Sequence, residues 1–318
     1  MKALRLVNPR TFEHVTLQEP SAPGPGEVLV AVRKIGICGT DISGYLGKMP
    51  FIEYPRILGH ELGVEVLAVG EGVDHIKVGD GCSVEPYLHC GDCFSCKRGC
   101  TNCCQHLQVL GVHVDGGMRE QMILPAFKLH PAKDLSFEQF ALVETLAIGC
   151  HAVARAKLTP GEDALVIGAG PIGLTVVIFA QLAGATATVL ELNEQRREFV
   201  TRHFPNVRVL GEITDGIAAA HAVFDATGHP VSMARALGLA RFTGRIVFVG
   251  ITREPVLLDD PLFHQRELTL MASRNALPGD FRRIIDLMTA GSLDVRPWIT
   301  HRCVLEDLPA QMPDWACA

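Results

Sequence analysis

Six cysteines lie within fifteen residues of this 318-residue chain, in the stretch CGDCFSCKRGCTNCC. Three of them recur at every third position and a fourth closes the stretch: Cys90, Cys93, Cys96 and Cys104. Four thiolates can surround a zinc ion completely, and such a shell leaves no coordination position for a substrate. The spacing therefore predicts a structural zinc ion that holds a loop and takes no part in catalysis.

Two alternatives remain open for the ligands of this stretch. Cys100 and Cys103 are spare, and either could replace Cys104 as the fourth ligand. The same thiolates could also hold an iron–sulfur cluster. A disulfide framework is disfavoured, because the N-terminus has no apolar segment of signal-peptide length and most of the eleven cysteines are clustered.

Other residues with metal-binding chemistry stand where β segments end or begin. Cys38 lies between two glycines in KIGICGTDISGY, and His60 and Glu61 open a second segment in RILGHELGVEV. A single cysteine or histidine is more often a packing residue than a ligand. The role of these three residues therefore depends on the rest of the chain.

A glycine pattern typical of dinucleotide binding follows the apolar run 164–167. The stretch GAGPIG fits G-x-G-x-x-G, in which the glycines permit a tight turn, a close approach to a pyrophosphate and close helix packing. The helix that begins there directs its N-terminus toward the anion. We expect the dinucleotide at Gly168, Gly170, Pro171, Ile172 and Gly173.

Glu191 ends the next apolar run, about twenty residues after the glycine turn, where a ribose-binding acid is expected. A carboxylate there accepts hydrogen bonds from ribose hydroxyls but repels a 2′-phosphate, so the cofactor predicted is NAD. Arg196 and Arg197 follow closely and leave NADP open. An arginine at this distance could instead lie over the adenine, and we assign Arg196 to the cofactor site on that basis.

The elements that position these residues divide the chain into an irregular β domain and an α/β domain. Short β segments run to about residue 126, and a helix spans about 136–157. Strand and helix patterns then alternate, which predicts a doubly wound parallel sheet of the Rossmann type. We place the domains at 1–150 and 151–290, with 291–318 returning to the first domain.

Composition favours a soluble enzyme. Hydrophobic residues make up 48% and the formal net charge is −6, which disfavours nucleic-acid binding and leaves no basic stripe for a membrane surface. No run approaches 18 uncharged apolar residues. We therefore expect a cytoplasmic protein that acts on a small molecule, with neither nucleic acid nor membrane as a partner.

Several motifs in order make the chain similar to a known family. They are GICGTD at 36–41, GHE at 59–61, the cysteine stretch, GVHVDGGMREQMILPA at 111–126, the helix with Glu144, and GAGPIG. Together they resemble zinc-dependent members of the medium-chain dehydrogenase superfamily, in the branch of polyol, sugar-acid and threonine dehydrogenases. The resemblance covers nearly the whole chain and implies a GroES-like β fold for the first domain. It also implies a homodimer or homotetramer, through the edge strand near residues 245–250.

The resemblance further implies two zinc ions in each chain, one of them catalytic. Cys38 and His60 would hold the catalytic zinc, with Glu61 and Glu144 as further ligands or water-bridged neighbours. Thr40 would take the substrate proton and pass it toward the cofactor ribose. Many members have a histidine three residues later, whereas this chain has Ser43, which cannot hold a proton at neutral pH. The relay must then run through the ribose and water, or through another residue.

The activity expected is hydride transfer from a secondary alcohol of a polyol or sugar acid to NAD. The stretches EPYLHCGDC and QVLGVHVDGG are more similar to sugar-acid dehydrogenases than to threonine dehydrogenases. L-Threonine oxidation remains an alternative, as does a non-catalytic NAD-binding protein. Family members continue into another strand beyond residues 315–318, so we expect a shortened return segment and an open sheet edge.

Overall fold

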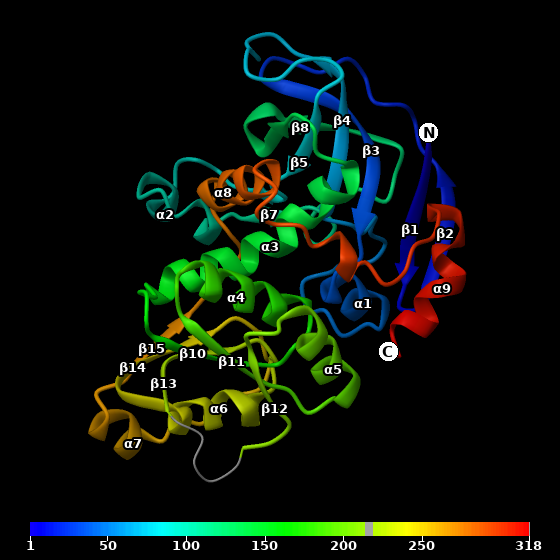
Figure 1. Cartoon of the computed structure of the whole chain (residues 1–318). Coiled ribbons are helices and arrows are strands. Elements are labelled where there is room, and N and C mark those ends of the chain that lie inside the picture. Colours follow the sequence, from blue (N-terminus) through cyan, green and yellow to red (C-terminus); the bar gives the residue numbers. More distant parts are fainter. Residues whose placement is uncertain (214–218, 318) are drawn as a thin grey trace. The chain divides into compact units, whose positions relative to one another are not determined.

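A computed structural model describes residues 1–213 and 219–317 of the chain (Figure 1). The chain forms two compact units, one made of Met1–Glu144 with Leu277–Ala318 and the other of Thr145–Ala276. The sequence pattern predicts boundaries at 150 and 290, whereas the two units meet at 144 and 276. The helix at 278–289 therefore lies in the first unit. Residue 318, the last of the expected return segment, lies outside the described residues.

The first unit is built on a five-stranded antiparallel sheet with the order β8-β3-β4-β5-β9. The strands are β3 (Glu27–Gly36), β4 (Glu61–Val69), β5 (Gly81–Val84), β8 (Gln121–Pro125) and β9 (Leu129–Ala132). Val28 and Val30 of β3 pack with Val64 and Val66 of β4 in one buried cluster. These alternating positions of EVLVAV and GVEV place their valines on one face of the sheet, as the period of a half-buried strand requires.

Shorter elements complete this unit. Two strand pairs are β1 (Lys2–Asn8) with β2 (Thr11–Thr16), and β6 (Tyr87–Leu88) with β7 (Gln108–Val109). Its helices are α1 (Gly39–Tyr45), α2 (Phe94–Lys97), α8 (Pro278–Thr289) and α9 (Leu308–Trp315), and α3 (Phe137–Ala156) runs from this unit into the next. Its 3₁₀ turns are Thr101–Cys103, Ala126–Lys128, Arg296–Trp298 and Leu305–Asp307.

A second buried cluster joins the two ends of the first unit. Leu308 and Met312 of α9 pack in one cluster with Leu4 and Leu6 of β1. Figure 1 shows α9, in red, beside β1 and β2, in dark blue. The return of the C-terminal segment to the first unit is thus a packing relationship between apolar side chains.

The second unit contains a six-stranded, wholly parallel sheet with the order β12-β11-β10-β13-β14-β15. The strands are β10 (Asp163–Ile167), β11 (Thr186–Leu190), β12 (Arg208–Leu210), β13 (Ala220–Asp225), β14 (Ala240–Phe248) and β15 (Thr269–Ala272). The helices are α4 (Pro171–Leu182), α5 (Glu194–His203), α6 (Pro230–Leu239) and α7 (Asp260–Gln265). The prediction of a GroES-like β domain and a doubly wound Rossmann domain is confirmed.

The outer strand of this sheet differs from the expected one. Arg245 lies in β14, which pairs with β13 on one side and with β15 on the other. The strand at the edge is therefore β15, because the chain continues through α7 and adds one more parallel strand. Within the described residues, no helix has the length and apolar character needed to cross a bilayer.

Candidate functional site

The structure brings Cys38, His60 and Glu61 together. The ligand atoms of these three residues all lie within 4.8 Å of one another. The cause is the pairing of the end of β3 with the start of β4, in which Gly36 lies opposite Glu61. A Cβ on Gly36 would lie only 2.1 Å from Glu61 Oε2, so a side chain there would displace the carboxylate. Gly36, two residues before Cys38, therefore leaves room for the Glu61 carboxylate in this group.

Asp41, which was not among the predicted site residues, connects the two segments that supply this group. Its buried carboxylate accepts hydrogen bonds from the backbone N–H of Cys38 at 2.9 Å and of Gly59 at 3.1 Å. It also lies 3.8 Å from Nδ1 of His60. Asp41 stands in the first turn of α1, where a carboxylate can cap the helix. The sequence does indicate this role, because Asp41 stands three residues after Cys38, the N-cap of α1. An acid at that position is a capping pattern.

The donor set fits a divalent metal ion. His60 is buried, and its Nδ1 has no hydrogen-bond partner within the described residues. Burial lowers the pKa of His60, but Asp41 and Cys38 outweigh burial and raise that pKa well above its usual value. The surroundings thus favour positive charge. One sulfur, one imidazole and one carboxylate in such a setting are ligands that suit zinc, with a position left for an exchangeable ligand.

Glu144 lies outside this group of three. It is buried in α3, and its Oε1 accepts a hydrogen bond from the hydroxyl of Tyr87. Burial raises the pKa of Glu144, and the charge of His60 and the bond from Tyr87 oppose that effect. The Glu144 carboxylate therefore interacts with the charge of His60, while Tyr87 makes its hydrogen bond. Its role as a zinc ligand stays a prediction.

Thr40 lies two residues after Cys38, in the first turn of α1, and is half-buried. Ser43 follows on the same helix. The backbone of this helix is fixed at its start by Asp41, because the Asp41 carboxylate receives the N–H of Cys38. The structure thus places Thr40 beside the cysteine of the candidate metal group, and its role in proton transfer stays a prediction.

The four predicted cysteines of the second group also come together. The Sγ atoms of Cys90, Cys93, Cys96 and Cys104 lie within 4.8 Å of one another, and none of these four cysteines forms a disulfide. Three of the separations are 3.5 Å, 3.9 Å and 4.0 Å. A tetrahedron with zinc–sulfur bonds of about 2.3 Å has edges of about 3.8 Å. The sulfurs thus have the spacing of a tetrahedral zinc shell.

Backbone N–H groups stabilise the thiolate form of Cys93 in this group, which favours the binding of a cation. The N–H groups of Gln105 and of Cys96 lower the pKa of Cys93 to about 6, so its thiolate is the main form at neutral pH. The N–H of His106 donates to Cys104 at 3.3 Å. Cys100 and Cys103 are exposed and lie outside the group. The geometry thus favours Cys104 as the fourth ligand.

The glycine turn of the second unit has the geometry that the sequence pattern requires. Gly168 has a φ of +92°, and its N–H donates to the carbonyl of Leu190 at the end of β11. A Cβ on Gly173 would lie 1.9 Å from the carbonyl oxygen of Gly168, so only glycine allows α4 to approach the turn. Gly170 is the N-cap of α4 and offers no side-chain cap, and Pro171 opens the helix. Backbone N–H groups at this helix start remain available to an anion.

Glu191 is tied to this turn. Its Oε2 accepts the N–H of Ala169 at 2.7 Å, and its Oε1 accepts the N–H of Asn193 at 2.8 Å. Arg197 fixes the same loop from outside, because its Nη1 donates to the carbonyls of Glu191 and Leu192. The acid at the end of β11 is thus oriented by backbone donors on both oxygens.

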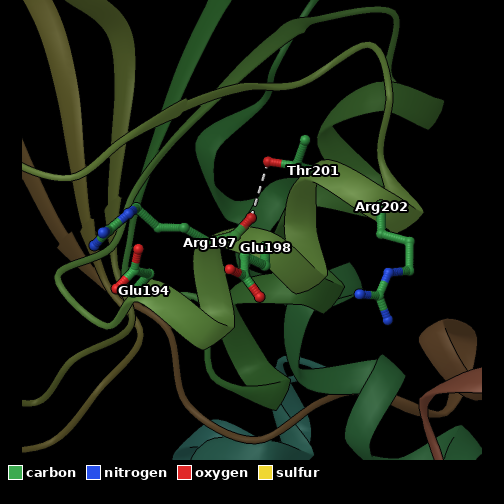
Figure 2. Close-up of a pocket in the computed structure, with 5 residues that line it drawn as sticks. All are labelled: Glu194, Arg197, Glu198, Thr201 and Arg202. Atoms are coloured by element: carbon green, nitrogen blue, oxygen red, sulfur yellow. Dashed lines mark hydrogen bonds between the residues drawn. The ribbon is translucent and has the colours of Figure 1, made fainter.

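Arg196 is exposed on α5, and its N–H donates to the Asn193 side chain, which caps the helix. A shallow pocket on α5 lies close by in sequence, and its lining residues are Glu194, Arg197, Glu198, Thr201 and Arg202. Figure 2 shows Arg197 and Arg202 extending in different directions from the helix, with the hydroxyl of Thr201 bonded to the Arg197 carbonyl. This pocket is a charged surface of a single helix and includes neither Glu191 nor Arg196.

Comparison with known proteins agrees with this geometry. Residues 24–134 match the alcohol dehydrogenase GroES-like domain, and residues 171–290 match the zinc-binding dehydrogenase domain. L-Galactonate-5-dehydrogenase of Escherichia coli is 40% identical over 294 residues, covering 90% of this chain and 86% of the relative. Sorbitol dehydrogenase of Bacillus subtilis is 32% identical over 323 residues, with coverages of 96% and 91%.

A solved structure shows the same fold. The Escherichia coli alcohol dehydrogenase RspB, in complex with NADH, has a TM-score of 0.92 and 29% identity, with coverage of 100% of this chain and 96% of the other. The chain belongs to the zinc-type medium-chain alcohol dehydrogenase family, in its polyol and sugar-acid branch. The family predicted from the sequence motifs is confirmed.

Proposed function

We propose that this chain is an NAD- and zinc-dependent dehydrogenase that transfers hydride from a secondary alcohol of a sugar acid or polyol to NAD. The observation that supports it best is the sulfur, imidazole and carboxylate group of Cys38, His60 and Glu61, in which Cys38 is half-buried and the other two side chains are buried. The second unit of the chain offers a glycine turn with an oriented acid for the dinucleotide. The names of the relatives favour a sugar acid or polyol over L-threonine as the substrate.

Zinc and NAD would supply one part of the chemistry, and the residues of the chain would supply the other. A zinc ion held by Cys38, His60 and Glu61 would lower the pKa of a substrate hydroxyl. NAD would supply the hydride acceptor. Asp41 holds the backbone at Cys38 and at Gly59, next to His60, and the burial of His60 and Glu61 strengthens electrostatic interactions there. Thr40 would receive the proton of the hydroxyl.

NADH formation tests this proposal. Purified protein with NAD is mixed with L-galactonate, sorbitol, L-arabinitol or L-threonine, with and without a zinc chelator. We expect NADH with a sugar acid or polyol, and loss of turnover with chelator. Cys38→Ser should abolish turnover, whereas Cys303→Ser, at an exposed free cysteine outside both groups, should leave it unchanged. NADH binding without turnover on any of these compounds would support the non-catalytic alternative instead.

We further propose that the protein works in the cytoplasm as a homodimer or homotetramer. Both cysteine-containing groups need reduced thiolates, which a reducing compartment maintains. The edge strand β15 has one unpaired side and an exposed Leu270, and a second copy could pair along it. Light scattering during size exclusion would measure the number of copies, and a monomer at micromolar concentration would contradict this proposal.

A further inference from the structure

Two turns of the second unit meet at the point where the order of its strands reverses. β10 continues to β11 and β12 on one side, and β13 continues to β14 and β15 on the other. β10 and β13 pair in parallel with Ile167 opposite Asp225. In such sheets, ligands bind in the crevice outside the carboxyl ends of the strands at this reversal. Gly168 follows β10 there, and the turn with Thr227 follows β13.

Asp225 holds the second of these turns. Its side chain is 0% exposed. One oxygen, Oδ1, accepts both the N–H of Thr227 at 2.9 Å and the Thr227 hydroxyl at 2.6 Å. The other oxygen accepts the hydroxyl of Ser232, in the first turn of α6. A single buried carboxylate thus fixes the turn and the start of the helix after it.

The hydroxyl of Thr227 has both of its hydrogen-bonding roles filled. It donates to Asp225 and accepts the N–H of His229 at 3.1 Å. The methyl group is then directed toward the glycine turn, since a Cβ on Gly168 would lie 3.1 Å from Thr227 Cγ2. Thr227 is nevertheless an exposed residue. An exposed side chain held in one orientation over the first glycine of G-x-G-x-x-G is suited to contact a ligand.

We propose that Asp225 is a positioning residue for the dinucleotide and that it acts through Thr227, which forms the side of the crevice opposite the glycine turn. The proposal rests on the proposed function, because it assumes that this unit binds NAD. A contact surface already held in its bound geometry binds more tightly, since less ordering is needed on binding. Loss of the hydrogen bonds of the Thr227 hydroxyl should therefore weaken dinucleotide binding.

NADH binding, followed by fluorescence titration of the purified chain, tests the proposal without knowledge of the substrate. Thr227→Val keeps the shape of the side chain but loses both hydroxyl bonds, and we expect NADH affinity to fall on the order of tenfold or more. Thr227→Ser keeps the hydroxyl and should bind NADH within about twofold of the unchanged chain. Asp225→Ala should weaken binding at least as much as Thr227→Val, because it also removes the acceptor of the Thr227 N–H and of the Ser232 hydroxyl. The double variant should be no weaker than Asp225→Ala alone, because Asp225→Ala already removes the acceptor of the Thr227 hydroxyl.

A matched control is Thr201→Val, on α5. The exposed Thr201 has a hydroxyl that donates to the carbonyl of Arg197 at 3.0 Å (Figure 2). This variant should bind NADH normally, and the melting temperature of each variant identifies any that fails to fold. Equal NADH binding by Thr227→Val and the unchanged chain would overturn the proposal and leave the proposed function standing. If the unchanged chain fails to bind NADH, both are overturned.

Discussion

Lys128 donates a hydrogen bond from its Nζ to Glu85, and the two side chains are 0% and 1% exposed. The second oxygen of Glu85 lies 3.4 Å from Nε2 of His130, whose ring stacks on Phe281 of α8. Burial lowers the pKa of Lys128, and the charge of Glu85 opposes that effect. Each charge in this cluster therefore depends on its partner to remain buried.

Removal of one partner should cost far more than removal of both. Lys128→Met leaves the Glu85 carboxylate buried without its cation, and we expect a loss of about 3–5 kcal/mol in the free energy of unfolding. Lys128→Met with Glu85→Leu should recover most of that loss, because no charge then remains buried. Urea denaturation of the two single variants and the double variant measures the coupling. Additive losses in the double variant would show that the pair is not coupled.

Asp41 should control the affinity of the Cys38 group for zinc. Asp41→Ala removes the acceptor for the N–H groups of Cys38 and Gly59 and the charge 3.8 Å from His60. We expect zinc affinity to fall by roughly 10–100-fold, as is usual for residues that orient metal ligands. Competition with a chromophoric chelator measures it. Glu53→Ala, at an exposed acid of the same unit, is the control, and unchanged affinity in Asp41→Ala would contradict the prediction.

The number of zinc ions bound by cysteine variants should show that the four-cysteine group holds an ion of its own. The unchanged chain should retain two zinc ions and Cys93→Ser one, with a lower melting temperature, because a shell of three thiolates holds its metal less tightly. Cys100→Ser should retain both ions, since Cys100 is exposed and lies outside the group. Elemental analysis after dialysis gives the count. Loss of zinc from Cys100→Ser but not from Cys93→Ser would reverse this assignment.

Stability at acid pH should depend in part on Glu162. Burial raises its pKa, but the N–H of Thr159 and the charge of Arg245 outweigh burial, so the folded-state pKa is lowered. A lowered folded pKa stabilises the protein above the unfolded pKa of about 4.3, and this contribution is lost as pH falls through the folded pKa. Solvent screening limits it to the order of 0.5 kcal/mol. Glu162→Gln should be slightly less stable at pH 7 and should lose less stability on acidification; a parallel loss in both proteins would contradict this.

Cofactor preference should depend on Glu191. The unchanged chain should bind NADH more tightly than NADPH, because the carboxylate repels a 2′-phosphate. Glu191→Gln keeps an oxygen for the N–H of Ala169 and removes the charge, so NADPH affinity should rise relative to NADH affinity. Titration with both dinucleotides measures the ratio. An unchanged ratio would assign the preference to other residues.

Residues whose position is set by local chain geometry could be predicted from the sequence. Gly168 and Gly173 are required by a turn that a side chain would block, and Glu191 follows its strand at the expected distance. Cys38 and Glu61 meet because two adjacent strands pair at their ends. For the glycine turn and Glu191 the sequence spacing directly determines the geometry, whereas the grouping of Cys38 with Glu61 was expected from the family resemblance.

Residues that depend on distant partners could not be predicted. Tyr87 meets Glu144 across 57 positions, and Lys128 meets Glu85 across 43. A lysine in a sequence suggests an exposed side chain, so nothing local indicated its burial. Prolines stand at 309 and 313 near the C-terminus, yet α9 forms there because Leu308 and Met312 have apolar partners in β1. Tertiary packing overrides local preference at these positions.

The packing of α9 against β1 determines the order in which the chain can fold during translation. Leu4 and Leu6 of β1 are synthesised about three hundred codons before Leu308 and Met312 of α9, with which they share a cluster. The second unit is continuous in sequence and can be completed in the meantime, because domains tend to fold as they emerge. The contact between β1 and α9 is thus among the last of the first unit to form, after Leu4 and Leu6 have had the chance to pack with Leu58 and Met118 of the same cluster.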